Sequence, residues 1–151
     1  MKEIDGIVIK DGQIILNSGE ELSIDQMIEG ARNIIFFNNR YFKDTKIKGI
    51  ADLRVVFENC IFENVFFENC DLREMGFKNH TVIRNCTFKR CNLNGTLFYD
   101  SHIISSSFFS CQMKRPSIED VSQIRECLFK QCKMHDIFFP LPEFQYNWKT
   151  V

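Results

Sequence analysis

Large apolar residues recur every five positions along most of the chain, a spacing typical of neither a helix nor an ordinary strand. From Phe57 the spacing holds as far as Phe139, with two one-residue insertions. The members of this column are Phe57, Phe62, Phe67, Leu72, Phe77, Ile83, Phe88, Leu93, Phe98, Ile103, Phe108, Met113, Ile118, Ile124, Phe129, Met134 and Phe139. So regular a repeat predicts a solenoid, in which each short segment is buried against the next turn.

A second column, of small residues, lies two positions before the first. Its members are Cys, Ser, Thr or Val, except for Met75, Pro116 and Ile137. Residues two apart in an extended segment point to the same side, so both columns are predicted to face inward. Because five residues are too few for an ordinary strand, we expect the chain to coil and to hydrogen-bond to its own next turn.

The segments FENCIFENVFFENCDLREM and NCTFKRCNLNGTLFYDS resemble the pentapeptide-repeat proteins, whose consensus is close to A-(D/N)-L-x-x. Ala51-Asp52-Leu53-Arg54 nearly reproduces that consensus. The resemblance covers about residues 35–139. It implies an all-β fold, a right-handed quadrilateral β-helix with four pentapeptides per coil and about five coils.

The length of the coil can be checked within the sequence, because every fourth repeat should share a face and a chemical character. The first face then holds Phe37, Phe57, Phe77, Phe98, Ile118 and Phe139, and the second holds Phe42, Phe62, Ile83, Ile103 and Ile124. The third holds Ile47, Phe67, Phe88, Phe108 and Phe129, and the fourth holds Leu53, Leu72, Leu93, Met113 and Met134. One-residue insertions between 47 and 53, 77 and 83, and 118 and 124 depart from the consensus.

The two ends are predicted to cap the solenoid, whose open edges need protection. Residues 1–34 form the N-terminal cap, with a hairpin around Asp11-Gly12 and a capping box from Ser23 to Gln26 that predicts a short helix ending near Gly30. Residues 35–139 form the β-helix. Residues 140–151, rich in aromatic side chains, form a C-terminal cap or docking segment.

All seven cysteines fall in the small inward column. Their spacings are C-x4-C and longer, unlike the C-x2-C of zinc sites, so we interpret them as small buried hydrophobes with little accessible thiol. We predict no metal and no cofactor. The odd number of cysteines and the acidic start MKEIDG favour reduced thiols and a cytoplasmic location. No apolar run approaches the ~20 residues that a transmembrane helix needs.

Candidate catalytic groups do not converge in this repeat. His80 falls at an inserted corner, and His102 and His135 are predicted to point outward from different faces. The sequence contains no Ser–His–Asp order, no glycine-rich phosphate loop and no paired carboxylates. We therefore predict that the protein is not an enzyme.

The residue before each large apolar one is polar in the family consensus, and on the first face this rule fails. That face instead carries an apolar stripe, which continues onto the second face and has acidic residues beside it. The predicted protein-binding residues are Phe36, Val56, Leu97, Phe138, Tyr41, Ile61, Glu58 and Asp100, together with Phe144 and Trp148 of the terminal segment. The alternative is that the terminal segment folds back and covers part of the stripe.

Charge narrows the choice of partner. The whole chain has a formal net charge of −1, whereas residues 35–139 carry 15 basic and 12 acidic side chains, for +3. Basic residues gather on the fourth face, at Arg54, Arg73, Lys114, Arg115 and Lys133. This balance argues against general nucleic-acid binding and against a strongly acidic DNA mimic.

The leading hypothesis is a non-enzymatic bacterial protein-binding module that docks on a partner protein through an apolar face of the β-helix. Such docking would serve an inhibitor or an immunity protein, from a bacterium or a phage, acting on a toxin or effector. The resemblance also implies an alternative, because some pentapeptide-repeat proteins mimic DNA and protect DNA gyrase or topoisomerase IV. A third hypothesis is a homodimeric structural scaffold. No membrane partner is predicted.

Overall fold

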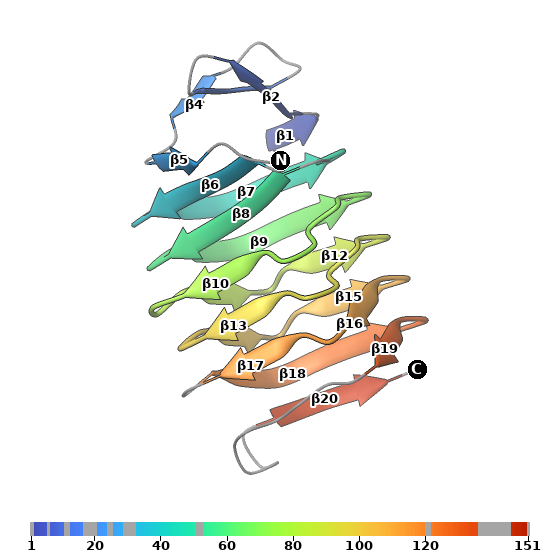
Figure 1. The fold of residues 1–151 in the computed structure, drawn as a ribbon. Coiled ribbons are helices and arrows are strands. Elements are labelled where there is room, and N and C mark those ends of the chain that lie inside the picture. Colours follow the sequence, from blue (N-terminus) through green and yellow to red (C-terminus); the bar gives the residue numbers. More distant parts are fainter. Residues whose placement is uncertain are drawn as a thin grey trace.

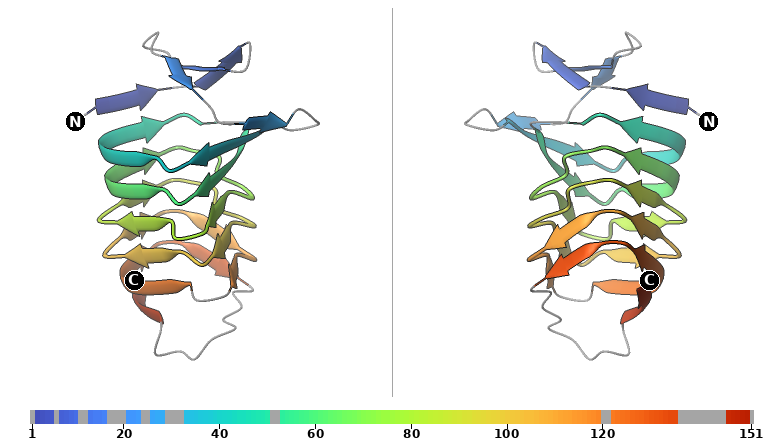
Figure 2. Two further views of the ribbon diagram at one scale, coloured as in Figure 1. Left: turned by 90° about the vertical axis from the view of Figure 1, so that its left-hand side faces the viewer. Right: turned by 90° about the vertical axis from the view of Figure 1, so that its right-hand side faces the viewer.

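The computed structural model describes residues 2–5, 7–10, 13–16, 21–23, 26–28, 33–50, 53–119, 122–135 and 146–150, with side chains described in 34–50, 54–117 and 122–134. Every regular element among these residues is a β-strand. The strands stack as the rungs of a solenoid (Figure 1), and the side views in Figure 2 show the rungs one above another along its axis. The predicted all-β solenoid is confirmed.

The first face is a parallel sheet with one strand from each turn. Its strands are β6 (Asn33–Asn38), β8 (Leu53–Glu58), β10 (Gly76–Lys78), β13 (Leu97–Tyr99) and β17 (Ser117–Glu119). The register places Phe57 between Phe37 and Phe77, and it places Phe98 beside Phe77. The predicted coil of about 20 residues is therefore confirmed on this face.

The second and third faces share one sheet, because three strands run around the corner between them. These are β7 (Tyr41–Lys48), β9 (Ile61–Glu68) and β18 (Gln123–Lys130). The intervening turns contribute β11 (Val82–Arg84) and β14 (His102–Ile104) to the second face, and β12 (Thr87–Lys89) and β15 (Ser107–Phe109) to the third. The fourth face holds bridges from Asn92 to Asp71 and Gln112, and the pair β16 (Gln112–Lys114) and β19 (Lys133–His135).

Phenylalanine rings fill the interior of the solenoid. On the third face Phe88 stacks on Phe67 and Phe108, with ring centroids 4.7 and 4.8 Å apart and planes within 5° of parallel. Across the corner between the first and second faces, Phe57 meets Phe62 edge to face at 4.7 Å. Aromatic pairs favour both arrangements, so one column stabilises its own face and the face beside it.

Hydroxyl groups in the small inward column satisfy buried backbone amides. Thr81 Oγ1 donates a hydrogen bond to the Lys78 carbonyl at 2.7 Å and accepts one from the Cys60 amide of the preceding turn at 3.2 Å. Ser106 and Ser122 accept hydrogen bonds in the same way from the amides of Cys86 and Ser101. These residues are therefore selected for their hydroxyl oxygen as well as for their small volume.

Thr81→Val is expected to destabilise the protein by about 1–3 kcal/mol, because it removes the buried hydroxyl that accepts from the Cys60 amide and donates to the Lys78 carbonyl, while preserving side-chain volume. Urea unfolding of the variant checks this. Thr87→Val is the matched control, since Thr87 lies half-buried on the outer side of β12 and should tolerate the change. Equal stability of the two variants would contradict the assigned role of the Thr81 hydroxyl.

Most corners in the part of the chain that the structure describes turn on a residue in the left-handed region, two positions after the large apolar residue. The first turns use Asn39 (φ 57°), Asp44 (φ 50°) and Gly49 (φ 71°), residue types that tolerate this conformation. At the insertion between 77 and 83, Asn79 and His80 are both left-handed, which is how this corner holds its extra residue. Later corners use less suitable residue types, at Glu74, Arg90, Ser105, Ser110, Arg115, Glu126 and Gln131.

Ser110→Asn is expected to stabilise the protein by roughly 1 kcal/mol, because Asn tolerates the φ of 53° at this corner better than Ser does. Ser107→Asn, the same change on the outer side of strand β15, is the control and should give no gain, since Asn is depleted in strands. Midpoints of thermal unfolding, measured side by side, separate the two. A gain at both positions would show that the corner conformation is not the cause.

The seven cysteines are free, six of them buried and Cys132 half-buried. Their sulfurs contact backbone carbonyls, as in Cys86 to the Arg84 oxygen at 3.3 Å. Burial raises the pKa of Cys86 and of Cys127 to about 11. Hydrogen bonds with Cys111 and Cys70 also raise the pKa of Cys91. The predicted placement of the cysteines in the interior is confirmed.

In the native protein a thiol reagent such as 5,5′-dithiobis(2-nitrobenzoate) is expected to react with Cys132 alone at pH 8. The other six thiols are buried and shielded from the reagent, whereas Cys132 is half-buried. All seven thiols should react after unfolding in guanidinium. Rapid reaction of several native thiols would contradict the buried column.

The N-terminal residues confirm one prediction and correct another. Strands β2 (Ile7–Lys10) and β3 (Gln13–Leu16) pair antiparallel as the expected hairpin, and β4 (Glu21–Ser23) extends it. The predicted short helix is wrong where the structure describes it. Residues Gln26–Ile28 form strand β5, which pairs antiparallel with β6. The unpaired edge of β6 offers hydrogen bonds to a whole segment, which outweighs a local capping signal.

Both chain ends add strands that the repeat did not reveal. Strand β1 (Lys2–Asp5) pairs parallel with the second half of β7, at the edge of the third face. Strand β20 (Tyr146–Thr150) pairs parallel with β18, with Tyr146 beside Ile124. The backbone of β20 therefore extends the sheet of the second and third faces, so this part of the terminal segment does not lie over the first-face stripe.

Candidate protein-binding surface

The apolar stripe predicted for the first face is interrupted. Val56 is only 4% exposed, so its expected place on the surface is wrong. A Cβ atom at Gly76, in the next turn, would lie 3.5 Å from Val56 Cγ1 and 3.6 Å from Lys78 Cε. Val56 and the stem of Lys78 thus both pack close to Gly76, and this packing covers Val56.

The other predicted contacts on this face are partly covered or lie outside the described residues. Phe36, Leu97, Glu58 and Asp100 are half-buried. The Asp100 carboxylate also pairs with His80 Nδ1 at 3.3 Å, across the inserted corner. Phe138 and Phe144 lie outside the described residues, as does the side chain of Trp148, whose backbone belongs to β20.

The second face carries two of the three exposed large hydrophobic residues found among the described residues. Tyr41 is 55% exposed and Ile61 is 36% exposed. Strand pairing places Ile61 directly beside Tyr41 and places the half-buried Val82 beside Ile61. These three side chains form one column across three turns, on strands β7, β9 and β11, as the sequence predicted. Farther along, the column becomes polar at His102 and Gln123.

A column of alternating charge borders this apolar column two residues along each strand. Lys43, Glu63 and Arg84 lie side by side, and Arg84 Nη2 is 3.6 Å from Glu63 Oε2. The Tyr41 hydroxyl donates a hydrogen bond to the same carboxylate. We name these six residues, Tyr41, Ile61, Val82, Lys43, Glu63 and Arg84, the second-face patch.

The hydrogen bond between Tyr41 and Glu63 shifts the pKa values of both side chains. It raises the pKa of the Tyr41 phenol and lowers the pKa of the Glu63 carboxyl. At neutral pH the phenol is therefore protonated and donates to an ionised carboxylate. A carboxyl of lowered pKa loses this bond only when the pH falls through its folded-state value. The orientation of the Tyr41 ring is thus fixed at neutral pH.

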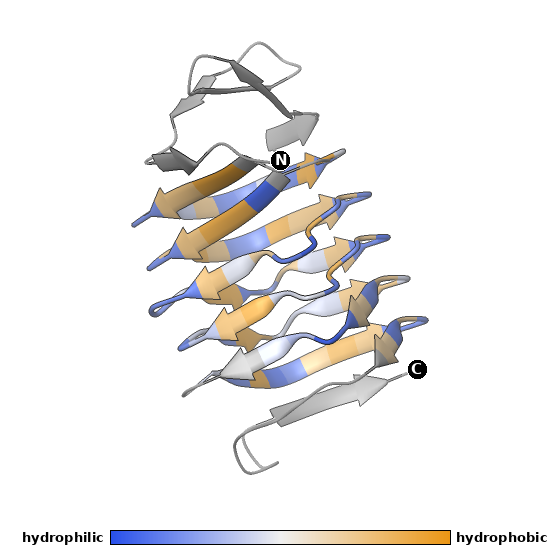
Figure 3. Cartoon of the chain, viewed as in Figure 1, coloured by the Kyte–Doolittle hydropathy of each residue, from blue (hydrophilic) through white to orange (hydrophobic). Residues whose placement is uncertain are grey.

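Tyr99 is an exposed aromatic residue that the sequence analysis did not select. It is 39% exposed and lies beside Lys78 on the first face, immediately before the corner. The earlier selection considered only the position before each large apolar residue, and Tyr99 follows Phe98. In Figure 3 hydrophobic residues lie mainly on the strands and hydrophilic residues mainly at the corners.

Alternative kinds of site were sought among the described residues. Within them, no group of three or more His, Cys, Asp or Glu side chains is placed to hold a metal ion. The same residues include no helix long and apolar enough to cross a membrane.

No protein-family model and no curated protein matches the chain. Two solved structures similar to it are trypsin-treated variants of QnrB1, a plasmid-mediated fluoroquinolone resistance protein. The first shares 12% identity over 76% of this chain and 77% of that one, with a TM-score of 0.34. The second shares 10% identity over 77% and 90%, with a TM-score of 0.20. The architecture above therefore rests on the strand pairing of this chain itself.

Proposed function

We propose that the chain is a non-enzymatic protein of the pentapeptide-repeat type that binds a partner protein through the second-face patch. The observation that carries this proposal is the exposure of Tyr41 and Ile61 side by side on adjacent strands of a parallel sheet. An apolar centre with a charged border is the usual composition of a protein interface. Tyrosine is also among the residue types that contribute most to binding energy.

The solenoid suits this role because its surface is formed before binding. Strand β9, at the centre of the patch, is paired with β7 on one side and β11 on the other, and stacked Phe rings lie in the interior behind it. A preformed surface loses little conformational entropy on docking, so more of the contact energy contributes to affinity. Inhibition or neutralisation of the partner, as by an immunity protein, is the purpose that we propose.

A second candidate is protection of DNA gyrase or topoisomerase IV, the alternative that the resemblance to pentapeptide-repeat proteins implies. The net charge of +3 over residues 35–139 does not support binding by mimicry of acidic DNA. On this candidate the apolar second-face patch, rather than a row of carboxylates, would make the contact. Under either candidate function, we propose that the protein acts in the cytoplasm.

Affinity capture from lysate of the host, with wild-type and Ile61→Asp baits in parallel, tests the proposed function. A protein retained by wild type and lost from the variant supports a partner that docks on the patch. Retention of gyrase or topoisomerase subunits, with protection of purified gyrase from a quinolone, selects the second candidate. Equal capture by both baits contradicts docking on the patch. A dimeric mass by light scattering, with nothing else captured, would favour the homodimer instead.

A further inference from the structure

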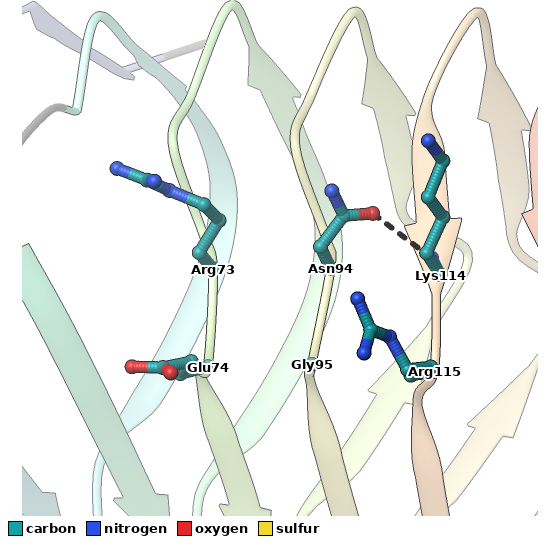
Figure 4. A pocket seen from close by; sticks show the side chains of 6 residues that line it. All are labelled: Arg73, Glu74, Asn94, Gly95, Lys114 and Arg115. Atoms are coloured by element: carbon teal, nitrogen blue, oxygen red, sulfur yellow. Dashed lines mark hydrogen bonds between the residues drawn. The ribbon is translucent and has the colours of Figure 1, made fainter.

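A groove crosses the fourth face, on the side of the solenoid that the second-face patch does not use. It has a volume of about 530 Å³ and is lined by Arg73, Glu74, Asn94, Gly95, Lys114 and Arg115 (Figure 4). These residues come in pairs from three successive turns, whose rungs lie about 4.8 Å apart. The groove therefore runs along the solenoid axis over a length of about 10 Å.

Gly95 lies between the other two pairs of residues that line this groove. Its φ is +69°, and an added Cβ would lie 3.4 Å from Glu74 Cγ. The equivalent corners of the turns before and after it carry the long side chains of Glu74 and Arg115. In Figure 4 the Glu74 carboxylate points away from Gly95, whereas the Arg115 guanidinium extends toward it. The absence of one side chain thus opens a space that a cation borders.

The positive charge at this groove is only partly neutralised within the protein. Arg73 is held by Asp71, with Nε 2.8 Å from Oδ1 and Nη2 2.7 Å from Oδ2. The Lys114 ammonium and the Arg115 guanidinium, by contrast, have no ion pair within the part of the chain that the structure describes. Lys133 lies beside Gln112 in the next turn and adds a third cation. Among the described residues, the C-terminal half of the groove therefore carries cations without an ion-pair partner.

The polar side chain of Asn94 lies beside these cations and is hydrogen-bonded to the next turn. Asn94 Oδ1 accepts the Lys114 amide at 2.9 Å, which fixes the Asn94 side chain against the next turn. Asn94 Nδ2 lies 3.4 Å from Gln112 Oε1, a long contact for an amide donor. The second hydrogen of this amide nitrogen can donate to an acceptor on a ligand. An anion in the groove would meet an amide, an ammonium and a guanidinium.

We propose that this groove binds the carboxylates of an extended acidic segment of a partner protein. This inference rests on the proposed function as a protein-binding module and adds a second contact surface to it. In an extended peptide, alternate side chains on one side are about 7 Å apart, so two carboxylates fit within the length of the groove. Arg115 suits one of them, because a guanidinium binds a carboxylate through two parallel hydrogen bonds.

Nucleic acid fits this surface less well than an acidic peptide. Affinity for a phosphate backbone grows with the number of cations that contact it, and a binding face carries an extended basic stripe. Here the cations are few, and the carboxylates of Asp71 and Glu74 lie in the same face. The whole chain is also slightly acidic, at −1. A short anionic segment needs only the local charge that the groove offers.

The test uses a fluorescein-labelled heptapeptide of alternating glycine and glutamate, with fluorescence anisotropy on the intact protein. We expect binding that weakens with added salt, and none to the peptide with glutamine in place of glutamate. The double variant Lys114→Gln with Arg115→Gln should bind at least about tenfold more weakly. Gly95→Asn should also weaken binding several-fold, because Asn tolerates the left-handed backbone but fills the groove.

The matched control is Lys89→Gln with Lys130→Gln, which removes the same charge from the third face and should leave affinity within about twofold. An equal loss of affinity in this control, or no binding of the glutamate peptide, would overturn the proposal that the groove binds carboxylates. Tighter binding of a twelve-nucleotide oligothymidylate, lost in the Lys114 and Arg115 variant, would instead assign it to nucleic acid. Partner capture that depends on Ile61 is read separately, so the groove can fail while the proposed function stands.

Discussion

Replacing Phe88 with alanine is expected to cost about 3–5 kcal/mol of stability. The ring is 1% exposed and stacks between Phe67 and Phe108 in the third-face column. Its removal loses the buried surface of the ring and leaves a cavity that adjacent turns cannot close, because backbone hydrogen bonds fix their spacing. The total free energy of unfolding of a domain of this size is about 5–15 kcal/mol, so this single substitution removes a large part of it.

Guanidinium unfolding followed by circular dichroism measures this loss. Phe66→Ala is the matched control, since Phe66 is half-buried on the outer side of the same face, where Lys46 lies over its ring at 5.4 Å. We expect it to cost about 1 kcal/mol or less. A small effect at Phe88, comparable with that at Phe66, would contradict the stacked interior.

Ile61→Asp is expected to weaken binding of the captured partner at least about a hundredfold, equivalent to about 2.7 kcal/mol. The change removes apolar area at the centre of the second-face patch and forces a carboxylate to lose its water on docking. It also places a second acid beside Glu63, the acceptor of the Tyr41 hydroxyl. Tyr41→Ala should weaken binding about tenfold, because it removes the ring and leaves the surface of the partner that the ring covered exposed.

Isothermal titration calorimetry with the purified partner measures both affinities. Gln123→Asp is the control, because Gln123 lies in the same column of the second face, two turns beyond Val82 and outside the patch. Its affinity should stay within about twofold of wild type. Circular dichroism and unfolding midpoints of all three variants show that the solenoid is intact. Unchanged affinity of Ile61→Asp would exclude the patch from the interface.

The interior of the solenoid could be predicted because the five-residue repeat determines which side chains face inward. A large residue every fifth position, with a small one two before it, leaves one arrangement in which Phe57, Phe77 and Phe98 share a face. The coil length follows from the chemistry of the columns. Insertions are legible too, since the extra residue between 77 and 83 had to enter at a corner, where His80 is found.

Exposure of the outward positions could not be predicted in the same way. Val56 and Ile61 are both β-branched residues placed just before an inward phenylalanine, yet one is buried and the other is exposed. The difference arises from Gly76 in the next turn and from the stem of Lys78, which are neighbours in space only. The basic residues of the fourth face could be predicted from the sequence. The groove between them could not, because it depends on the position of Gly95 at a corner.

The chain ends escaped prediction for a related reason. Ser23 and the residues after it carry a local helix-start signal, and sequence reasoning gives such a signal full weight. In the folded chain, Gln26–Ile28 meets the free edge of β6, and pairing there satisfies backbone groups along the whole segment. Strand β1 joins β7 for the same reason. The pairing of β1 with β7 joins segments more than 40 residues apart, and neither pairing leaves a period in the sequence.

Photo-crosslinking from within the patch tests the central claim most directly. A benzoylphenylalanine placed at Ile61 should crosslink to the partner protein on illumination, whereas the same group at Lys89, on the third face, should not. Mass spectrometry of the crosslinked peptide then identifies the contact on the partner. Crosslinking from position 89 but not from position 61 would contradict docking through the second face.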